Sequence, residues 1–165
     1  HPFEDGNGRI GRALAEKALA ETLEKPILVS LSKKIEENKQ AYYETLKQAQ
    51  RKQDVSDWLR YFFTILIEAQ KEVKDTVLYV VEKALFFKRY NHQLNERQTK
   101  VLQKMTEKGK SGFEGGMTAK KYISITKTSK ATATRDLQFL FEIGALIRAG
   151  DGRNVKYHLN WTLFS

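Results

Sequence analysis

The first twelve residues, HPFEDGNGRIGR, concentrate residue types that suit phosphate chemistry. Gly6, Asn7 and Gly8 stand at the start of a predicted helix, where free backbone N–H groups and the helix dipole favour an anion. Arg9 and Arg12 are three residues apart, so they share one face of that helix. Planar guanidinium groups bind phosphate in a bidentate manner, and the stretch therefore predicts a phosphate site.

Two more residues of this stretch supply the rest of the chemistry. Asp5 is a hard oxygen ligand suited to Mg²⁺, an ion that also bridges phosphates. His1 titrates near neutral pH, so it suits the role of general base. We therefore expect binding of a polyphosphate and removal of a proton from an attacking hydroxyl.

In order and spacing, these residues resemble the signature of the Fic family, His-Pro-Phe-x-(Asp/Glu)-Gly-Asn-Gly-Arg-x-x-Arg, and match every fixed position. Proteins of that family mostly transfer AMP from ATP to a hydroxyl side chain of a target protein. The resemblance implies that His1 deprotonates a Ser, Thr or Tyr hydroxyl of the target. It also implies that Asp5 holds the Mg²⁺ that bridges the α- and β-phosphates of ATP.

The remaining motif positions take their roles from the same resemblance. Gly6, Asn7 and Gly8 would form the anion-binding nest, with Asn7 also reaching the α-phosphate, while Phe3 would anchor the loop in the core. The two arginines would neutralise the β- and γ-phosphates of the leaving pyrophosphate.

Other reactions of the family stay open. Doc-like kinases carry lysine where this chain has Gly8. Phosphocholine transfer and removal of AMP from a modified target are alternatives, because the motif alone does not set the orientation of the nucleotide, but AMP transfer is favoured. Many members are inhibited by a glutamate in the pattern (Ser/Thr)-x-x-x-Glu-(Gly/Asn), which pairs with the second arginine, here Arg12. The nearest match, Ser32 to Glu37, fails at its last position and is expected to be an ordinary helix start.

Three helices are expected to position this motif. Apolar periodicity predicts helices over residues 7–23 and 32–50, and a long third helix that begins after Asp54 and ends near Tyr90. The segment KEVKD, residues 71–75, is a candidate break in that helix or a bridge between two domains. The expected apolar faces comprise Ile10, Ala13, Leu14, Ala18 and Leu19; Ile35, Tyr42, Tyr43 and Leu46; and Trp58, Leu59, Phe62, Phe63, Leu66, Ile67, Val73, Val77, Val80, Val81 and Leu85.

The C-terminal part has the element order of a winged helix-turn-helix. Asn95 and Gln98 form a capping box, Thr118 caps a short helix, residues 130–143 form another helix, and a hairpin is centred on residues 150–152. The stretch SKATATRDLQFLFEIGALI is similar to recognition helices of bacterial winged-helix regulators, and many Fic proteins carry such a domain.

Charge is concentrated in this part. Residues 1–94 hold 16 Lys/Arg against 14 Asp/Glu, whereas residues 95–165 hold 13 against 6. This asymmetry favours DNA as a partner, although winged helices also serve as protein adaptors or dimerisation modules. Leu137, Leu140 and Phe141 are expected to face the core. The candidate nucleic-acid contacts are Lys130, Thr134, Arg135 and Gln138 on the helix, and Arg153 and Lys156 on the wing.

We therefore expect a mainly α fold: the remnant of a helical Fic core at 1–90, followed by a winged helix-turn-helix domain with a small β-hairpin at 91–165. The absence of cysteine favours a reducing compartment, the cytoplasm, and no apolar run suggests a membrane partner. The chain has no initial methionine, so we expect part of a longer protein that is active as a whole and inert in this piece. ATP, Mg²⁺ and a target protein are the expected ligands, and a homodimer is left open.

Overall fold

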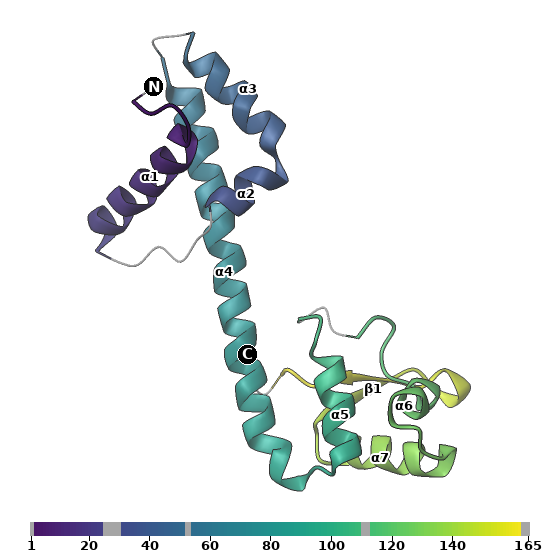
Figure 1. Ribbon diagram of the computed structural model, residues 1–165. Helices are drawn as coiled ribbons and strands as arrows, with labels where there is room; N and C mark the ends of the chain where they lie inside the picture. Colours follow the sequence, from purple (N-terminus) through teal and green to yellow (C-terminus); the bar gives the residue numbers. More distant parts are fainter. Residues whose placement is uncertain (1, 25–30, 52–53, 110–112, 163–165) are drawn as a thin grey trace. The chain divides into compact units, whose positions relative to one another are not determined.

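The computed structural model describes residues 2–24, 31–51, 54–109 and 113–162. Within this part the chain is mainly α-helical with one two-stranded antiparallel sheet, as the sequence predicted (Figure 1). It divides into two compact units, His1–Asp75 and Thr76–Ser165. The division falls inside one long helix, α4 (Ser56–Tyr90), whereas the predicted boundary after residue 90 coincides with the end of that helix.

Unit 1 contains α1 (Asn7–Leu23), α2 (Leu31–Glu37), α3 (Lys39–Ala49) and the first part of α4. The single helix predicted over residues 32–50 is in fact two helices, because Asn38 has non-helical dihedral angles (φ −137°, ψ 50°) and takes the N-cap position of α3. The buried core of this unit consists of Leu31, Ile35, Tyr42, Ile65 and Leu66, with Leu19, Leu46, Trp58, Tyr61 and Phe62 packed against it.

The predicted apolar faces are only half correct. On α4, Leu59, Phe63 and Ile67 are 44%, 45% and 51% exposed, because the helix turns the adjoining stripe that contains Trp58 and Phe62 toward the core. The later valines of the predicted face and Leu85 are also exposed, apart from half-buried Val73. On α1 and α3, the predicted core residues Ile10, Leu14 and Tyr43 are likewise exposed, while Leu19 packs inward.

The helix α4 runs without interruption through residues 71–75, so the predicted break there is wrong. The alternative prediction, a bridge between two domains, agrees with the division into units after Asp75. Lysine and glutamate are good helix formers, and a single valine and aspartate cost little within a helix of this length. Its start is as expected, since the Asp54 carboxylate accepts a hydrogen bond from the Ser56 backbone N–H at 2.9 Å. Among the described residues, no helix is both long and apolar enough to cross a membrane.

Unit 2 places α5 (Glu96–Met105), α6 (Ala119–Thr126) and α7 (Lys130–Glu142) before the hairpin of β1 (Leu146–Ala149) and β2 (Lys156–Leu159). The C-terminal part of α4 and two short 3-10 helices, Asn91–Gln93 and Gly152–Asn154, complete its described elements. This is the predicted order, and the predicted caps are confirmed: Asn95 and Gln98 form a capping box, and the Thr118 side chain accepts from Lys121 N–H. The strands pair antiparallel from Leu146 opposite Leu159 to Ala149 opposite Lys156.

A buried carboxylate joins the three helices of this unit. Asp136 of α7 is 6% exposed and accepts hydrogen bonds from Arg97 Nε (3.1 Å), Gln98 Nε2 (3.3 Å) and the Tyr122 hydroxyl (2.8 Å). Burial, reinforced by this hydrogen bond, raises the pKa of the Tyr122 hydroxyl well above its ordinary value. Leu137 and Leu140 are buried as predicted, but Phe141 is 39% exposed, because one helical step from Leu140 turns it toward solvent.

Candidate functional site

The predicted phosphate motif forms a turn that leads directly into α1. Gly6 has a left-handed backbone (φ 78°) and is the N-cap of the helix, a conformation that glycine adopts without a steric penalty. The Asn7 side chain stabilises this turn, because its Oδ1 accepts from Phe3 N–H at 3.1 Å and its Nδ2 donates to Phe3 O at 2.6 Å. The N-cap residue supplies no side-chain hydrogen bond to this helix, and the N–H groups and dipole of such a helix end favour an anion.

Asp5 lies at the mouth of this turn. Its Oδ1 accepts from Gly6 N–H at 2.6 Å, and its Oδ2 lies 3.5 Å from Arg9 Nη2. The Asp5 and Arg9 side chains are 94% and 75% exposed, so both are open to a ligand. A carboxylate and a guanidinium group are therefore adjacent at the positive end of α1.

Arg12 lies one turn further along α1 and connects that helix to α2. Its Nε donates to Ser32 Oγ at 3.1 Å. Gly8 leaves room for this side chain, because a Cβ atom there would lie 3.3 Å from Arg12 Nη1. Glu16 Oε1 also accepts from Leu31 N–H at 3.2 Å, so two contacts fix the start of α2 against α1.

The same contacts bear on the imperfect inhibitory pattern at residues 32–37. Ser32 contacts Arg12, whereas Glu36 forms its ion pair with Lys39 at 3.1 Å. The glutamate of the pattern thus pairs with the first residue of α3. This arrangement agrees with the interpretation of the segment as an ordinary helix start.

A pocket of about 730 Å³ joins the motif to α3. One wall consists of residues 4–9 and Arg12, and the other of Tyr43, Leu46, Lys47 and Gln50. These three residues of α3 and its C-cap, Gln50, were not predicted as site residues. Their spacing of three, four and seven places them on one helical face, which is the sequence signal that could have found them.

A smaller apolar pocket of about 360 Å³ adjoins this site and shares Gly8 and Arg12 with it. Tyr42, Trp58 and Phe62 contribute aromatic walls. The charged pocket is therefore bordered, at two motif residues, by a space that suits an apolar or aromatic group.

The donor set fits a magnesium ion that is shared with phosphates. Mg²⁺ in such sites is held by one or two carboxylates, by phosphate oxygens and by water. Asp5 provides one exposed carboxylate beside the anion position, and the described residues contain no cluster of three or more His, Cys, Asp or Glu. Asp5 is therefore the residue that would hold the ion, with the phosphates as its other ligands.

The other predicted motif residues have different outcomes. The general base, His1, lies outside the described residues. Phe3 is 51% exposed, so the predicted apolar anchor is wrong: the loop is fixed through the Phe3 backbone, which bonds to Asn7, rather than through the ring. The Asn7 carboxamide, predicted to reach a phosphate, is engaged in this turn.

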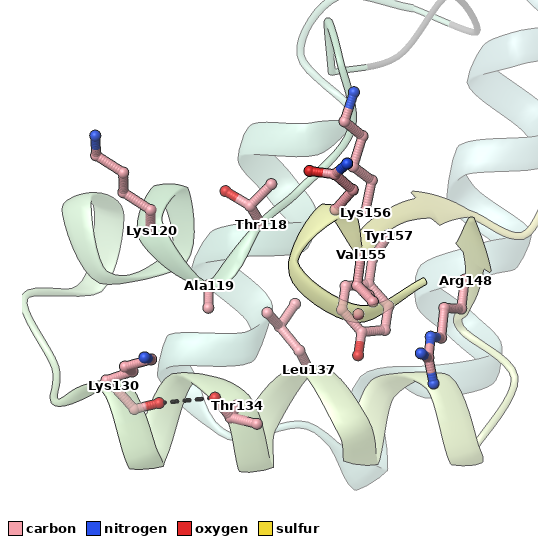
Figure 2. Close-up of a pocket in the computed structure, with 12 residues that line it drawn as sticks. Thr118, Ala119, Lys120, Lys130, Thr134, Leu137, Arg148, Val155, Lys156 and Tyr157 are labelled. Carbon is pink, nitrogen blue, oxygen red and sulfur yellow. Dashed lines mark hydrogen bonds between the residues drawn. The ribbon is translucent and has the colours of Figure 1, made fainter. Parts of the chain in front are cut away.

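In unit 2 the predicted nucleic-acid contacts have three different outcomes. Lys130, Thr134 and Lys156 line one pocket of about 610 Å³ between α6, α7 and the hairpin (Figure 2). Arg135 and Gln138 are exposed but do not line it. The side chain of Arg153, in the 3-10 helix of the wing, lies outside the described part.

No protein-family model matches this chain, and a search of curated proteins finds no relative. The resemblance to the Fic family therefore depends on the sequence motif alone.

Proposed function

We propose that unit 1 is the ATP-phosphate-binding part of a protein that transfers AMP to a hydroxyl side chain of a target protein. The observation that carries this proposal is the pocket at the uncapped N-terminus of α1, where Asp5, Arg9 and Arg12 share one wall. The charges and the free helix end suit a polyphosphate with its metal ion. The adjoining aromatic space suits the nucleoside.

In the proposed reaction the target hydroxyl oxygen attacks the α-phosphorus of ATP. The bond from that phosphorus to the oxygen bridging the α- and β-phosphates breaks, AMP remains on the target, and pyrophosphate leaves. His1 takes the hydroxyl proton, while Arg9 and Arg12 offset the charge that develops on the leaving group. Magnesium, when bound, neutralises the charge of the phosphates and fixes their orientation.

Nucleotide binding is the first test, because it does not require a target protein. Isothermal titration calorimetry of the chain with ATP and Mg²⁺ is expected to show binding that falls about tenfold or more in Arg12→Ala, since a charge-assisted contact to phosphate is lost. Asp5→Asn should weaken binding only when Mg²⁺ is present. Arg60→Gln, a change of an exposed arginine of α4 outside the pocket, is the matched control.

Transfer itself is tested on the longest natural form of the protein, with ATP labelled at the α- or the γ-phosphate. The proposal expects α-label on protein, no γ-label, and loss of labelling in His1→Ala. Labelling from the γ-phosphate would contradict it, because that result indicates phosphoryl transfer. Equal α-labelling by wild type and His1→Ala would also contradict it.

A second function, binding of duplex DNA, is proposed for unit 2. Lys130, Thr134, Arg135 and Lys156 are exposed on α7 and the wing, as the winged-helix resemblance requires, and they support this proposal. Measurement of DNA affinity at low salt tests it, since binding driven by phosphate contacts must strengthen there.

A further inference from the structure

The pocket of about 610 Å³ between α6, α7 and the hairpin of unit 2, called the groove below, is lined by residues that lie far apart in the sequence (Figure 2). Lys120 comes from the first turn of α6, Lys130 from the start of α7, Arg148 from β1 and Lys156 from β2. Neither Lys120 nor Arg148 was a predicted contact. Four cations from four elements thus surround one groove.

The charged residues that line the groove are all positive. Among its described lining residues, none carries a carboxylate. The nearest acid to its arginine is Asp151, whose Oδ1 lies 3.9 Å from Arg148 Nη2 on a fully exposed side chain. An exposed pair at this distance is weak and is readily exchanged for a stronger anion. The electrostatics of the groove therefore favour a negatively charged ligand.

The direction of the side chains indicates the shape of that ligand. In Figure 2 the ends of Lys120 and Lys156 point away from α7, whereas Arg148 extends toward it. Because these charges do not converge on one point, a single small anion would meet few of them. A chain of successive phosphates, with several charges spaced along its length, fits the arrangement.

The exposed face of α7 that does not line the groove, formed by Arg135, Gln138 and Glu142, is its outward face. This face is less suited to an anion than the groove is. The amide Nε2 of Gln138 donates to Glu142 Oε1 at 3.0 Å, and this carboxylate is itself exposed on the same helix. A nucleic acid that approaches this face meets a negative charge and an amide that is already bonded. Arg135 is left as the cation of this face.

We propose that the groove is the principal binding site for the sugar-phosphate backbone of duplex DNA, with Lys120 and Arg148 as contact residues, and that the outward face of α7 contributes less. This inference rests on the second proposed function, DNA binding by unit 2, and specifies where the contacts lie. Contacts of this kind position the backbone and carry little sequence information. The expected binding is therefore salt-dependent and nearly independent of base sequence.

The test compares three double variants of the full chain by fluorescence anisotropy, using mixed-sequence duplexes about two helical turns long. Lys120→Gln with Arg148→Gln removes two charges from the groove. Lys100→Gln with Lys104→Gln removes two from exposed positions of α5 and is the matched control. Arg135→Gln with Gln138→Ala tests the outward face of α7. Circular dichroism confirms that each variant is folded.

The magnitude follows from counterion release. Each phosphate contact contributes about 0.9 to the slope of log affinity against log salt, so loss of two contacts should flatten the slope by about 2. The same relation predicts a loss of about two-hundredfold at 50 mM salt and about twentyfold at 200 mM. The α5 control should change affinity by less than about threefold, because long-range attraction is largely screened.

The outcomes separate the inference from the function on which it rests. Absence of DNA binding by the wild type at low salt would remove the second proposed function and this inference with it. Binding that survives in the groove variant but is lost in the α7 variant would overturn the inference alone. Displacement of DNA by polyglutamate at equal charge concentration would also overturn it, since the groove would then prefer an acidic polypeptide.

Discussion

Replacement of Asp136 by alanine tests whether a buried carboxylate organises unit 2. Asp136 accepts hydrogen bonds from three side chains on α5 and α6, and those from Gln98 and Tyr122 are buried. In Asp136→Ala the Gln98 and Tyr122 donors lose a charged acceptor while they stay buried, whereas Arg97, whose side chain is 46% exposed, can turn to solvent. The two buried donors therefore account for most of the expected cost.

The size of the effect can be worked from these contacts. Hydrogen bonds to charged groups contribute about 1.5–3 kcal/mol each, and removal of one member of a buried network costs about 3–5 kcal/mol. With the arginine discounted, we expect Asp136→Ala to lower the free energy of unfolding by about 3 kcal/mol. For a unit of this size that loss corresponds to a fall in Tm of about 12 °C or more. Asp136→Asn keeps the volume and one acceptor, so about half of that loss is expected.

The assay can follow unit 2 alone, because each unit contains one tryptophan. Trp58 lies in unit 1, whereas Trp161 packs in unit 2 with its ring centre 5.4 Å from that of Phe86. In a Trp58→Phe background, urea and thermal unfolding followed by fluorescence report the unfolding of unit 2. Glu142→Ala is the matched control, since it removes an exposed carboxylate from the same helix. If Asp136→Ala and Glu142→Ala unfold at the same urea concentration, the network does not stabilise the unit and the reasoning is refuted.

Three further predictions concern unit 2. The pKa of the Tyr122 hydroxyl is raised in the folded state. The contribution of the protonated hydroxyl to stability is therefore full below the ordinary tyrosine pKa and is lost as pH rises above about 10. Tyr122→Phe should flatten this alkaline fall in the urea concentration at the unfolding midpoint. Gly150→Ala should lower stability by about 2 kcal/mol, because Gly150 has φ +78° and a Cβ atom there would lie 2.7 Å from the Asn154 carbonyl oxygen. Gly152→Ala, where a Cβ atom would meet no atom within 4 Å, should cost about half as much. Equal falls in Tm for the two variants would contradict this prediction. Asn95→Ala removes the capping box of α5 and should cost about 1 kcal/mol by urea unfolding, with no measurable change counting against the role of the cap.

The local features of this protein are predictable because they depend on residues close together in the chain. The cap formed by Asn95 and Gln98, the cap at Thr118 and the hairpin are set by hydrogen bonds or turn conformations that span a few residues. The turn of the phosphate motif is of the same kind, since Gly6 and Asn7 determine it within five residues. The order of residues along the chain is therefore enough to recognise the motif.

The choice of buried face was not predictable from periodicity alone. An apolar stripe on α4 is wide enough to present either Trp58 and Phe62 or Leu59 and Phe63 to the core, and α2 and α3 decide which pair is buried. The same reason explains why Phe141 is exposed although it adjoins buried Leu140. Packing partners distant in sequence determine these outcomes.

The sequence by itself determined the helical and hairpin elements, most of their ends and the turn of the predicted phosphate motif, because short-range hydrogen bonds and backbone preferences are encoded locally. Only the tertiary structure decided which elements share a site. It placed one face of α3 opposite the motif, and it joined Lys120 and Arg148 in one groove. It also buried Asp136 between three helices. These assemblies depend on distances between residues far apart in the chain, which packing of the hydrophobic core sets and local patterns do not contain.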